Sequence, residues 1–219
     1  MTAVNYRVQS GSALFLGAVL DEGGCNFAVH CPNADSVKLC LFSEKDEEQI
    51  AIIDMPAKTG KVWHCYVEGI QAGQLYGYRT SGADHDASGS RFLPEKLLID
   101  PYAKALSRPM FWDAKLYAGD SQKMVAKSVV VANSGKQERA AKPNTPLDHT
   151  ILYEAHVKGM TAQHPDVPTK LQGTYLGMCQ PCIIEHLKDL GISAVQLMPV
   201  AAFMPEPYIT NKGLTNQLF

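Results

Sequence analysis

The sequence predicts a β-sandwich in the first half of the chain, followed in the second half by a strand–helix–strand unit of a parallel sheet. Two observations lead to this fold class. Between about residues 25 and 79, five short apolar runs recur every 11 to 13 residues and are separated by turn residues. Between about residues 150 and 200, two apolar runs flank a segment whose apolar side chains have helical spacing. A chain of 219 residues can bury a core in one or two such domains.

The five runs of the first half have the length of strands and carry no helical pattern. The segments between them contain proline, glycine, asparagine and charged residues, which are typical of turns. In the fourth run, Trp63, Cys65 and Val67 alternate with the residues between them, as the side chains of a half-buried strand do. Regularly spaced short strands without helices predict a β-sandwich. The predicted strands are Asn26–Cys31, Val37–Phe42, Ile50–Met55, Val62–Val67 and Leu75–Arg79.

In the second half, Thr150–Val157 and Ala194–Val200 are apolar runs rich in β-branched residues, and both have the length of strands. Cys182–Leu190 places its apolar side chains on one helical face and its charged side chains on the other, and Gly191 follows as a helix stop. Because parallel strands need a connection of a dozen or more residues, the crossover between the two runs predicts that they pair in parallel.

Polar segments divide the predicted elements into three parts. Ser81–Ser90 has the glycine- and serine-rich composition of a loop, and Ser134–Pro146 has that of a linker. We therefore predict a sandwich domain over residues 1–112, a connecting segment over residues 113–149, and the strand–helix–strand unit over residues 150–219.

The composition is ordinary for a soluble globular protein, with 46% hydrophobic and 19% charged residues. A formal net charge of −2 and the absence of a basic run predict no nucleic-acid partner. Ala13–Leu20 is apolar, but eight residues do not span a bilayer and no basic stretch precedes them, so we predict a strand entry and no membrane or signal segment. Six cysteines without the spacing of a secreted framework predict a cytoplasmic protein.

Two short motifs are similar to metal or redox sites. Cys179 and Cys182 form a single CxxC pair. We interpret them as two packed thiols near the start of a helix, in preference to a zinc or redox site. Asp84 and Asp86 flank His85 in the predicted glycine–serine loop, where a solvated turn is favoured over a metal site. We therefore predict no metal and no cofactor.

Several segments, taken in order, resemble the bacterial glycogen debranching enzymes and isoamylases, which are family-13 glycoside hydrolases of the α-amylase superfamily. The motif Tyr153-Glu-Ala-His-Val-Lys-Gly159 and the closing Leu197-Met-Pro-Val200 carry the strongest resemblance. The first half resembles the family-48 carbohydrate-binding module that precedes the catalytic barrel in these enzymes. The other matching segments are Leu16–Ala18, Asp21–Val29, Val62–His64, Gly73–Arg79, Lys96–Lys104, Lys127–Val131, Gly173–Tyr175 and Leu187–Ile192.

The resemblance implies an immunoglobulin-like sandwich of the carbohydrate-binding-module type, then a (β/α)8 TIM barrel that acts on α-1,6 branch linkages of glycogen-like glucans. Only two barrel strands match, and the chain departs from the family after Asn216. Such barrels collect catalytic groups from several strands, and retaining glycosidases need two carboxyl groups. No residue matches those motifs, so we predict that the catalytic residues belong beyond Phe219. Glu154 and His156 lie on a predicted barrel strand, and we interpret them as strand-building residues.

Carbohydrate-binding modules stack glucose rings on exposed aromatic side chains. Trp63, Tyr76 and Tyr78 are the candidate carbohydrate-binding residues on the predicted sandwich strands, which also carry Tyr66. In the structural alternative, Trp63 packs in the sandwich core, and the face with Tyr76 and Tyr78 meets the barrel. We favour this alternative and expect glucan binding to be weak or absent.

The leading functional hypothesis is the N-terminal fragment of a glycogen debranching enzyme, inactive alone because it lacks the catalytic carboxylates. The alternative hypothesis is a stand-alone glucan-binding or regulatory protein without hydrolase activity, which uses the barrel remnant as an interface. An intact small hydrolase is disfavoured by the missing carboxylates. The open edges of the two barrel strands predict self-association.

Overall fold

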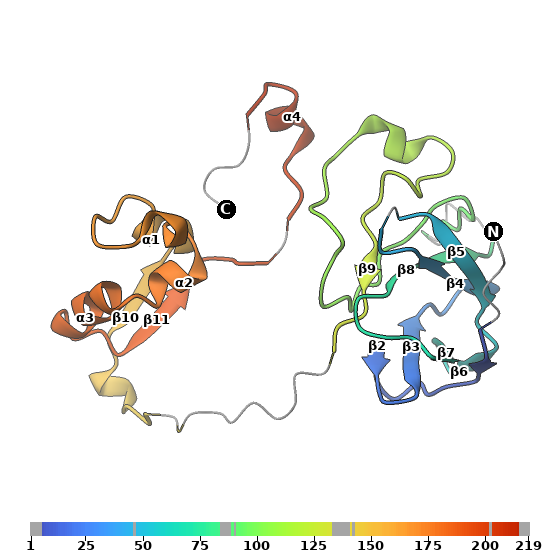
Figure 1. Cartoon of the computed structure of the whole chain (residues 1–219), viewed down its shortest axis with the longest axis horizontal. Helices are drawn as coiled ribbons and strands as arrows, with labels where there is room; N and C mark the ends of the chain where they lie inside the picture. The colour runs from blue at the N-terminus through green and yellow to red at the C-terminus, as the bar shows by residue number, and fades with distance from the viewer. Residues whose placement is uncertain are drawn as a thin grey trace. The chain divides into compact units, whose positions relative to one another are not determined.

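The computed structural model of the protein describes residues 6–45, 47–83, 89, 91–132, 141, 143–201 and 203–214. The chain divides into two compact units, residues 1–137 and residues 138–219 (Figure 1). Unit 1 is built from antiparallel strands, and unit 2 combines short helices with a parallel pair of strands. Each unit has its own hydrophobic core.

The first sheet of unit 1 consists of β1 (Val8–Gln9), β2 (Gly17–Leu20), β3 (Gly24–His30), β6 (Ala57–Thr59) and β7 (Val62–Glu68). The strands lie in the order β1-β7-β3-β2, with β6 also paired to β7, and every pairing is antiparallel. The two central strands pair over their whole length, from Gly24 opposite Glu68 to His30 opposite Val62.

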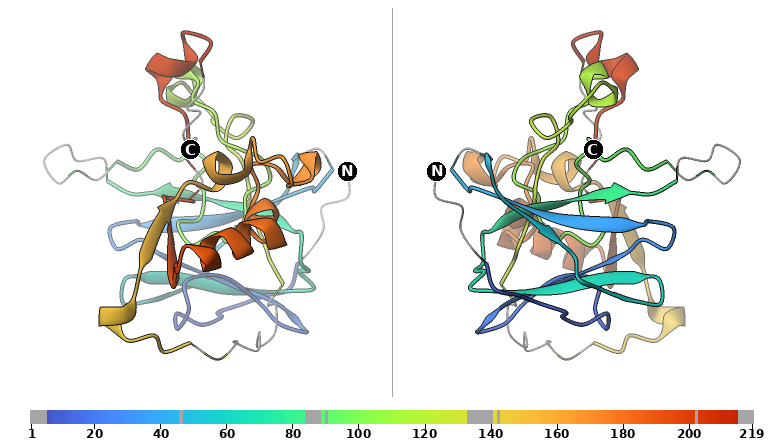
Figure 2. Two further views of the ribbon diagram at one scale, coloured as in Figure 1. Left: turned by 90° about the vertical axis from the view of Figure 1, so that its left-hand side faces the viewer. Right: turned by 90° about the vertical axis from the view of Figure 1, so that its right-hand side faces the viewer.

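The second sheet consists of β4 (Ser36–Phe42), β5 (Gln49–Asp54), β8 (Leu75–Ser81) and β9 (Ser128–Val129), in the antiparallel order β5-β4-β8-β9. Figure 2 shows the strands of the two sheets in separate layers. The predicted β-sandwich is confirmed, and each of its five predicted strands is observed with both ends within two residues. Ala13–Leu20, predicted as the entry to a strand, ends in β2. The strands of unit 1 that the sequence did not predict, β1, β6 and β9, have two or three residues, too few for an alternating pattern to be visible.

The core of unit 1 lies between the two sheets. Phe27 on β3 packs edge-on against Tyr76 on β8, with ring centroids 5.0 Å apart. Burial raises the pKa of the Cys25 and Cys65 thiols to about 12, so these two cysteines act as apolar core residues and not as nucleophiles. Other fully buried members of this core are Val37, Leu39, Leu41 and Val67.

Residues 10–16 form a strap across the outer face of the first sheet, because they connect β1 at one edge with β2 at the other. Asn26 on β3 holds the strap by accepting the backbone N–H of Ser12 at 2.7 Å and donating to its carbonyl oxygen at 2.9 Å. The ring of His64 on β7 lies 2.6 Å from the carbonyl oxygen of Ser10. His64 is therefore buried, although the alternation along β7 turns it outward.

Residues 91–132 cover the outer face of the second sheet. They contribute Leu97 and Val125 to a second buried cluster, whose other buried members are Cys40, Phe42 and Leu75. Strand β8 is consequently buried on both faces over Leu75–Tyr78. The segment contains a short 3-10 helix, Ala114–Tyr117, and returns to the sheet through β9.

Unit 2 contains a two-stranded parallel sheet of β10 (Leu152–Ala155) and β11 (Ala194–Leu197), so the predicted parallel pairing is confirmed. The helices are α1 (Val157–Thr161), α2 (Tyr175–Met178), α3 (Pro181–Asp189) and α4 (Pro207–Thr210), with 3-10 turns at Leu147–His149 and Thr169–Leu171. The predicted helix is α3, and Gly191 follows it with a φ of +71°, as expected for a helix stop. Strand β10 is shorter than predicted because His156 is already the N-cap of α1.

The core of unit 2 is small. Its buried side chains are those of Val167, Ile183 and Leu187, against which Tyr153, Met160, Leu171 and Ile192 pack. Many other large apolar side chains of this unit are at least 39% exposed, among them Ile151, Leu152, Tyr175, Val195, Leu197, Met198, Val200 and Tyr208. The sheet thus exposes side chains of the kind that a larger parallel sheet buries on both faces.

Candidate functional site

Trp63 lies on β7 and is half-buried, with part of its ring packed against the sandwich core. Its indole Nε1 donates a hydrogen bond of 3.1 Å to the carbonyl oxygen of Cys31. The Nζ of Lys58 lies 4.9 Å from the centroid of the ring and donates to the carbonyl oxygens of Pro32 and Ala34. The ring is therefore held in one orientation, with a cation over one face, and keeps partial access to solvent.

Tyr76 and Tyr78 on β8 are each 1% exposed. Their rings pack edge to face with centroids 5.9 Å apart, and both hydroxyls donate to Oδ2 of the buried Asp100, over 2.8 Å and 3.3 Å. Burial raises the pKa of both hydroxyls and also that of Asp100. The structure thus places both rings inside the sandwich, where they satisfy a buried carboxyl group. Neither presents a face to a sugar or to another domain, because both rings belong to the buried core between the two sheets.

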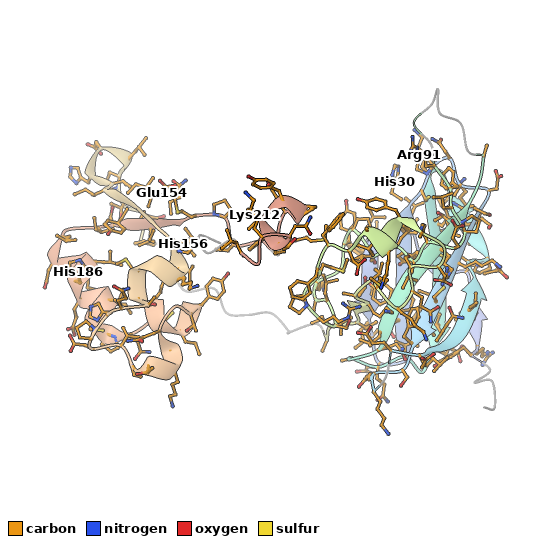
Figure 3. The ribbon with its side chains drawn as sticks, turned by 90° about the horizontal axis from the view of Figure 1, so that it is seen from above. His30, Arg91, Glu154, His156, His186 and Lys212 are labelled. Carbon is orange, nitrogen blue, oxygen red and sulfur yellow. The ribbon has the colours of Figure 1, made fainter. Side chains whose placement is uncertain are left out.

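One carboxyl group and three imidazoles of unit 2 line one hollow of about 540 Å³: Glu154 on β10, His156 directly after it, His164 after α1 and His186 on α3. Figure 3 labels Glu154, His156 and His186. The Nδ1 of His156 accepts the backbone N–H of Gly159 at 2.9 Å, so this ring caps α1. Among the described residues that line the hollow, Glu154 alone carries a carboxyl group. Retaining glycosidases use two carboxyl groups about 5 to 5.5 Å apart, and this hollow provides one.

A second hollow of unit 2, of about 390 Å³, opens at the carboxyl ends of β10 and β11. It is lined by His156 and Lys158 after β10, by Thr174 and Tyr175 at the start of α2, and by residues 198–201 after β11. Tyr175 is 56% exposed, so an aromatic ring stands here beside polar groups. In complete barrels and open α/β sheets, ligands bind at the carboxyl ends of the parallel strands, which is the end where this hollow lies.

Of the residues that the structure describes, no group of three or more His, Cys, Asp or Glu side chains is placed to hold a metal ion. Asp84, His85 and Asp86 lie outside the described residues. Cys179 is exposed and Cys182 is half-buried in α3, and both are free thiols. Within the same described part, no helix is long and apolar enough to cross a membrane.

Residues 15–103 match the family model of carbohydrate-binding module 48, described as the isoamylase N-terminal domain. This range contains the strands from β2 to β8. The glycogen debranching enzyme of Yersinia enterocolitica serotype O:8 is 41% identical over 94% of this chain and 32% of its own length. That of Yersinia pseudotuberculosis serotype IB is 42% identical over the same shares. The chain spans about a third of the length of the curated relatives it matches.

Solved structures with a similar fold include a pullulanase from Anoxybacillus sp. LM18-11 in complex with maltotetraose. The TM-score is 0.66 and the identity 23%, over 87% of this chain and 26% of that one. An apo pullulanase from Paenibacillus barengoltzii gives a TM-score of 0.63 and 21% identity, over 87% of this chain and 27% of that one. At these identities the likeness shows a common fold alone.

Proposed function

We infer that this chain, which carries a family-48 carbohydrate-binding module and resembles the N-terminal part of bacterial glycogen debranching enzymes, binds glycogen-like α-glucan through its sandwich. We also propose that it does not hydrolyse the glucan by itself. The observation that carries the proposal is the family-48 match, because the matched residues are those that form most of the sandwich strands. The debranching activity named for the relatives supports a branched α-glucan as the ligand.

Unit 2 is proposed to be the first strand–helix–strand of a (β/α)8 barrel of the α-amylase superfamily. Two observations support this: β10 and β11 are parallel, and helix α3 lies in the crossover between them. The exposed apolar side chains of the pair support it further, since neighbouring strands and helices bury such side chains in a complete barrel. We retain the division into residues 1–112, 113–149 and 150–219 as part of this proposal.

We expect the purified chain to release no reducing ends from glycogen, amylopectin or pullulan above the rate of a mock purification. A retaining glycosidase needs both a carboxylate nucleophile and a carboxylic acid, and Glu154 is without a second carboxyl group among the described residues of its hollow. A reducing-sugar assay on the three glucans measures this. Turnover that disappears in Glu154→Gln or in His156→Ala would contradict the proposal.

We expect the chain to migrate more slowly in native gels that contain glycogen, with Trp63 as a sugar-contacting residue. Trp63→Phe keeps an aromatic ring but reduces its stacking area, so the apparent affinity should fall about threefold. Tyr78→Phe is the matched control, because its ring is enclosed and its retardation should equal that of the wild type. Equal retardation of all three proteins, with similar melting curves, would exclude a role for Trp63.

The alternative proposal is a stand-alone glucan-binding or regulatory module. The buried core between the two sheets of unit 1 favours it, because such a core does not depend on residues of unit 2. A cytoplasmic location is proposed in either case, since all six cysteines are free thiols and three of them are buried.

A further inference from the structure

The strap of residues 10–16 leaves part of the outer face of the first sheet uncovered. Gln9 on β1, Tyr66 on β7, Asn26 on β3 and Val19 on β2 are register partners, so these four side chains form one row across the sheet. A hollow of about 520 Å³ lies between this row and the strap. The remaining lining residues are Gly11, Ser12, Leu14 and Phe15 of the strap and Asp21 from the turn between β2 and β3.

The walls of this hollow are fixed in the free protein. Gly11 has a φ of +68°, and a Cβ there would meet the backbone of β7 at 2.6 Å, so only glycine lets the strap lie this close. Asn26 fixes the next residue, Ser12, through two hydrogen bonds. On the opposite wall, the hydroxyl of Tyr66 donates to Oδ1 of Asp21 at 2.6 Å, and this oxygen also accepts two backbone N–H groups of its turn. A preformed site of this kind loses little conformational entropy on binding.

The hollow combines apolar and polar surface. Phe15 and Leu14 on the strap are 63% and 76% exposed. The hydrogen bond from Tyr66 holds the pKa of Asp21 below its usual value, and the same bond raises the pKa of Tyr66 to about 12. At neutral pH the hollow therefore presents a carboxylate and a neutral phenol beside an exposed aromatic ring.

We propose that this hollow is a second carbohydrate-contacting site of the module and takes a short stretch of an α-glucan chain. The proposal rests on the inferred glucan binding of the sandwich and assigns it a surface distinct from Trp63. Phe15 offers its ring to the apolar face of a pyranose, while Asp21 and Gln9 accept hydrogen bonds from sugar hydroxyls. A glucan satisfies both kinds of surface. An apolar polypeptide segment would instead displace water from the Asp21 carboxylate without offering it a new hydrogen bond, at a cost in free energy.

The test uses the full 219-residue chain with maltoheptaose as the probe. In ¹⁵N NMR titrations, the backbone amides of Ser12 and Tyr66 report on the hollow, and the indole N–H of Trp63 reports on the other proposed surface. We expect the amides of the hollow to shift, and Phe15→Ser to weaken the affinity measured from them about tenfold. Phe111→Ser is the matched control, because Phe111 is 61% exposed and does not line the hollow.

Asp21→Asn provides a second variant, because it keeps an acceptor for the turn but removes the charge; it should also weaken the binding. Loss of affinity in Phe15→Ser and Asp21→Asn, but not in Phe111→Ser, establishes the site. Shifts confined to the Trp63 indole, or wild-type affinity in both hollow variants, would overturn the proposal that the hollow is a sugar site. The proposed glucan binding by the module would then still stand. A titration in which no resonance shifts would overturn both proposals, namely that the module binds glucan and that the hollow is a sugar site.

Discussion

Replacing Lys127 with methionine is expected to lower the free energy of unfolding of unit 1 by about 3 kcal/mol. Lys127 is 1% exposed, and its Nζ lies 3.0 Å from Oε2 of Glu47. The same Nζ donates to the carbonyl oxygens of Gln122 and Val125 at 2.7 Å and 2.6 Å. Methionine replaces the apolar stem but leaves these acceptors without their donor. The expected loss is at the lower end for a broken buried pair because the Glu47 side chain is 26% exposed and partly screened.

Urea unfolding followed by circular dichroism measures this loss. Lys38→Met is the matched control, since Lys38 pairs with Asp54 at 3.5 Å on the surface, where the two side chains are 47% and 79% exposed. Its effect should stay below about 0.5 kcal/mol. If Lys127→Met destabilised the protein no more than Lys38→Met, the buried pair would contribute no net stability.

The same pair makes the stability of unit 1 depend on pH. Burial raises the pKa of Glu47, but hydrogen bonds from Ser107 and Lys127 and the charges of Lys127 and Arg108 outweigh it, so the pKa lies below its usual value. A carboxyl group whose pKa is lowered in the folded state contributes stability above its unfolded pKa, and this contribution is lost as the pH falls through the folded pKa. The difference between wild type and Lys127→Met should therefore shrink below about pH 4.

Lys127 illustrates what could not be predicted from the sequence. It stands in a polar-looking segment, and its partner Glu47 lies 80 positions earlier. Its burial depends on how residues 91–132 pack on the second sheet, which no local pattern encodes. The five main strands were predictable because each carries its own apolar run and is bounded by its own turn residues.

The exposure of aromatic rings depends on topology in the same way. Tyr78 has the sequence pattern of a strand residue on a half-exposed sheet, yet it is enclosed because its ring lies in the core between the two sheets, where a later segment supplies Asp100 to its hydroxyl. Phe15 stands in an apolar run that predicts the entry to a strand, yet it is exposed because this run crosses the sheet as the strap. The candidate hollow beside Tyr66 could therefore be found only once β1 and β2 were known to lie at opposite edges.

In unit 2 the connection length was enough to predict the pairing. A crossover of this size is typical of parallel strands and far exceeds a two-residue hairpin, and β10 and β11 are parallel. The lengths of the strands were not predictable. The apolar run of the first strand continues to Val157, but the ring of His156 accepts the N–H of Gly159 and starts a helix there.

The exposed sheet of unit 2 is expected to make the chain self-associate at concentrations of about 100 µM. Among the described strands, β10 and β11 pair only with each other, so each keeps one open edge. Leu152 on β10 is 58% exposed and Val195 on β11 is 41% exposed. Open, apolar strand edges recruit strands of other chains. Sedimentation equilibrium should therefore give an average mass that rises above the monomer mass as the concentration increases.

Leu152→Lys should return the chain to a monomer, because a lysine on an edge strand opposes pairing with another chain. Tyr117→Lys is the control, since Tyr117 is 76% exposed in unit 1 and its substitution adds the same charge away from the sheet. Equal loss of association in both variants would assign the effect to net charge and not to the sheet edge. A wild-type chain that stays monomeric throughout would mean that unit 2 covers its own edges, and this result would favour the stand-alone glucan-binding module over the fragment of a debranching enzyme.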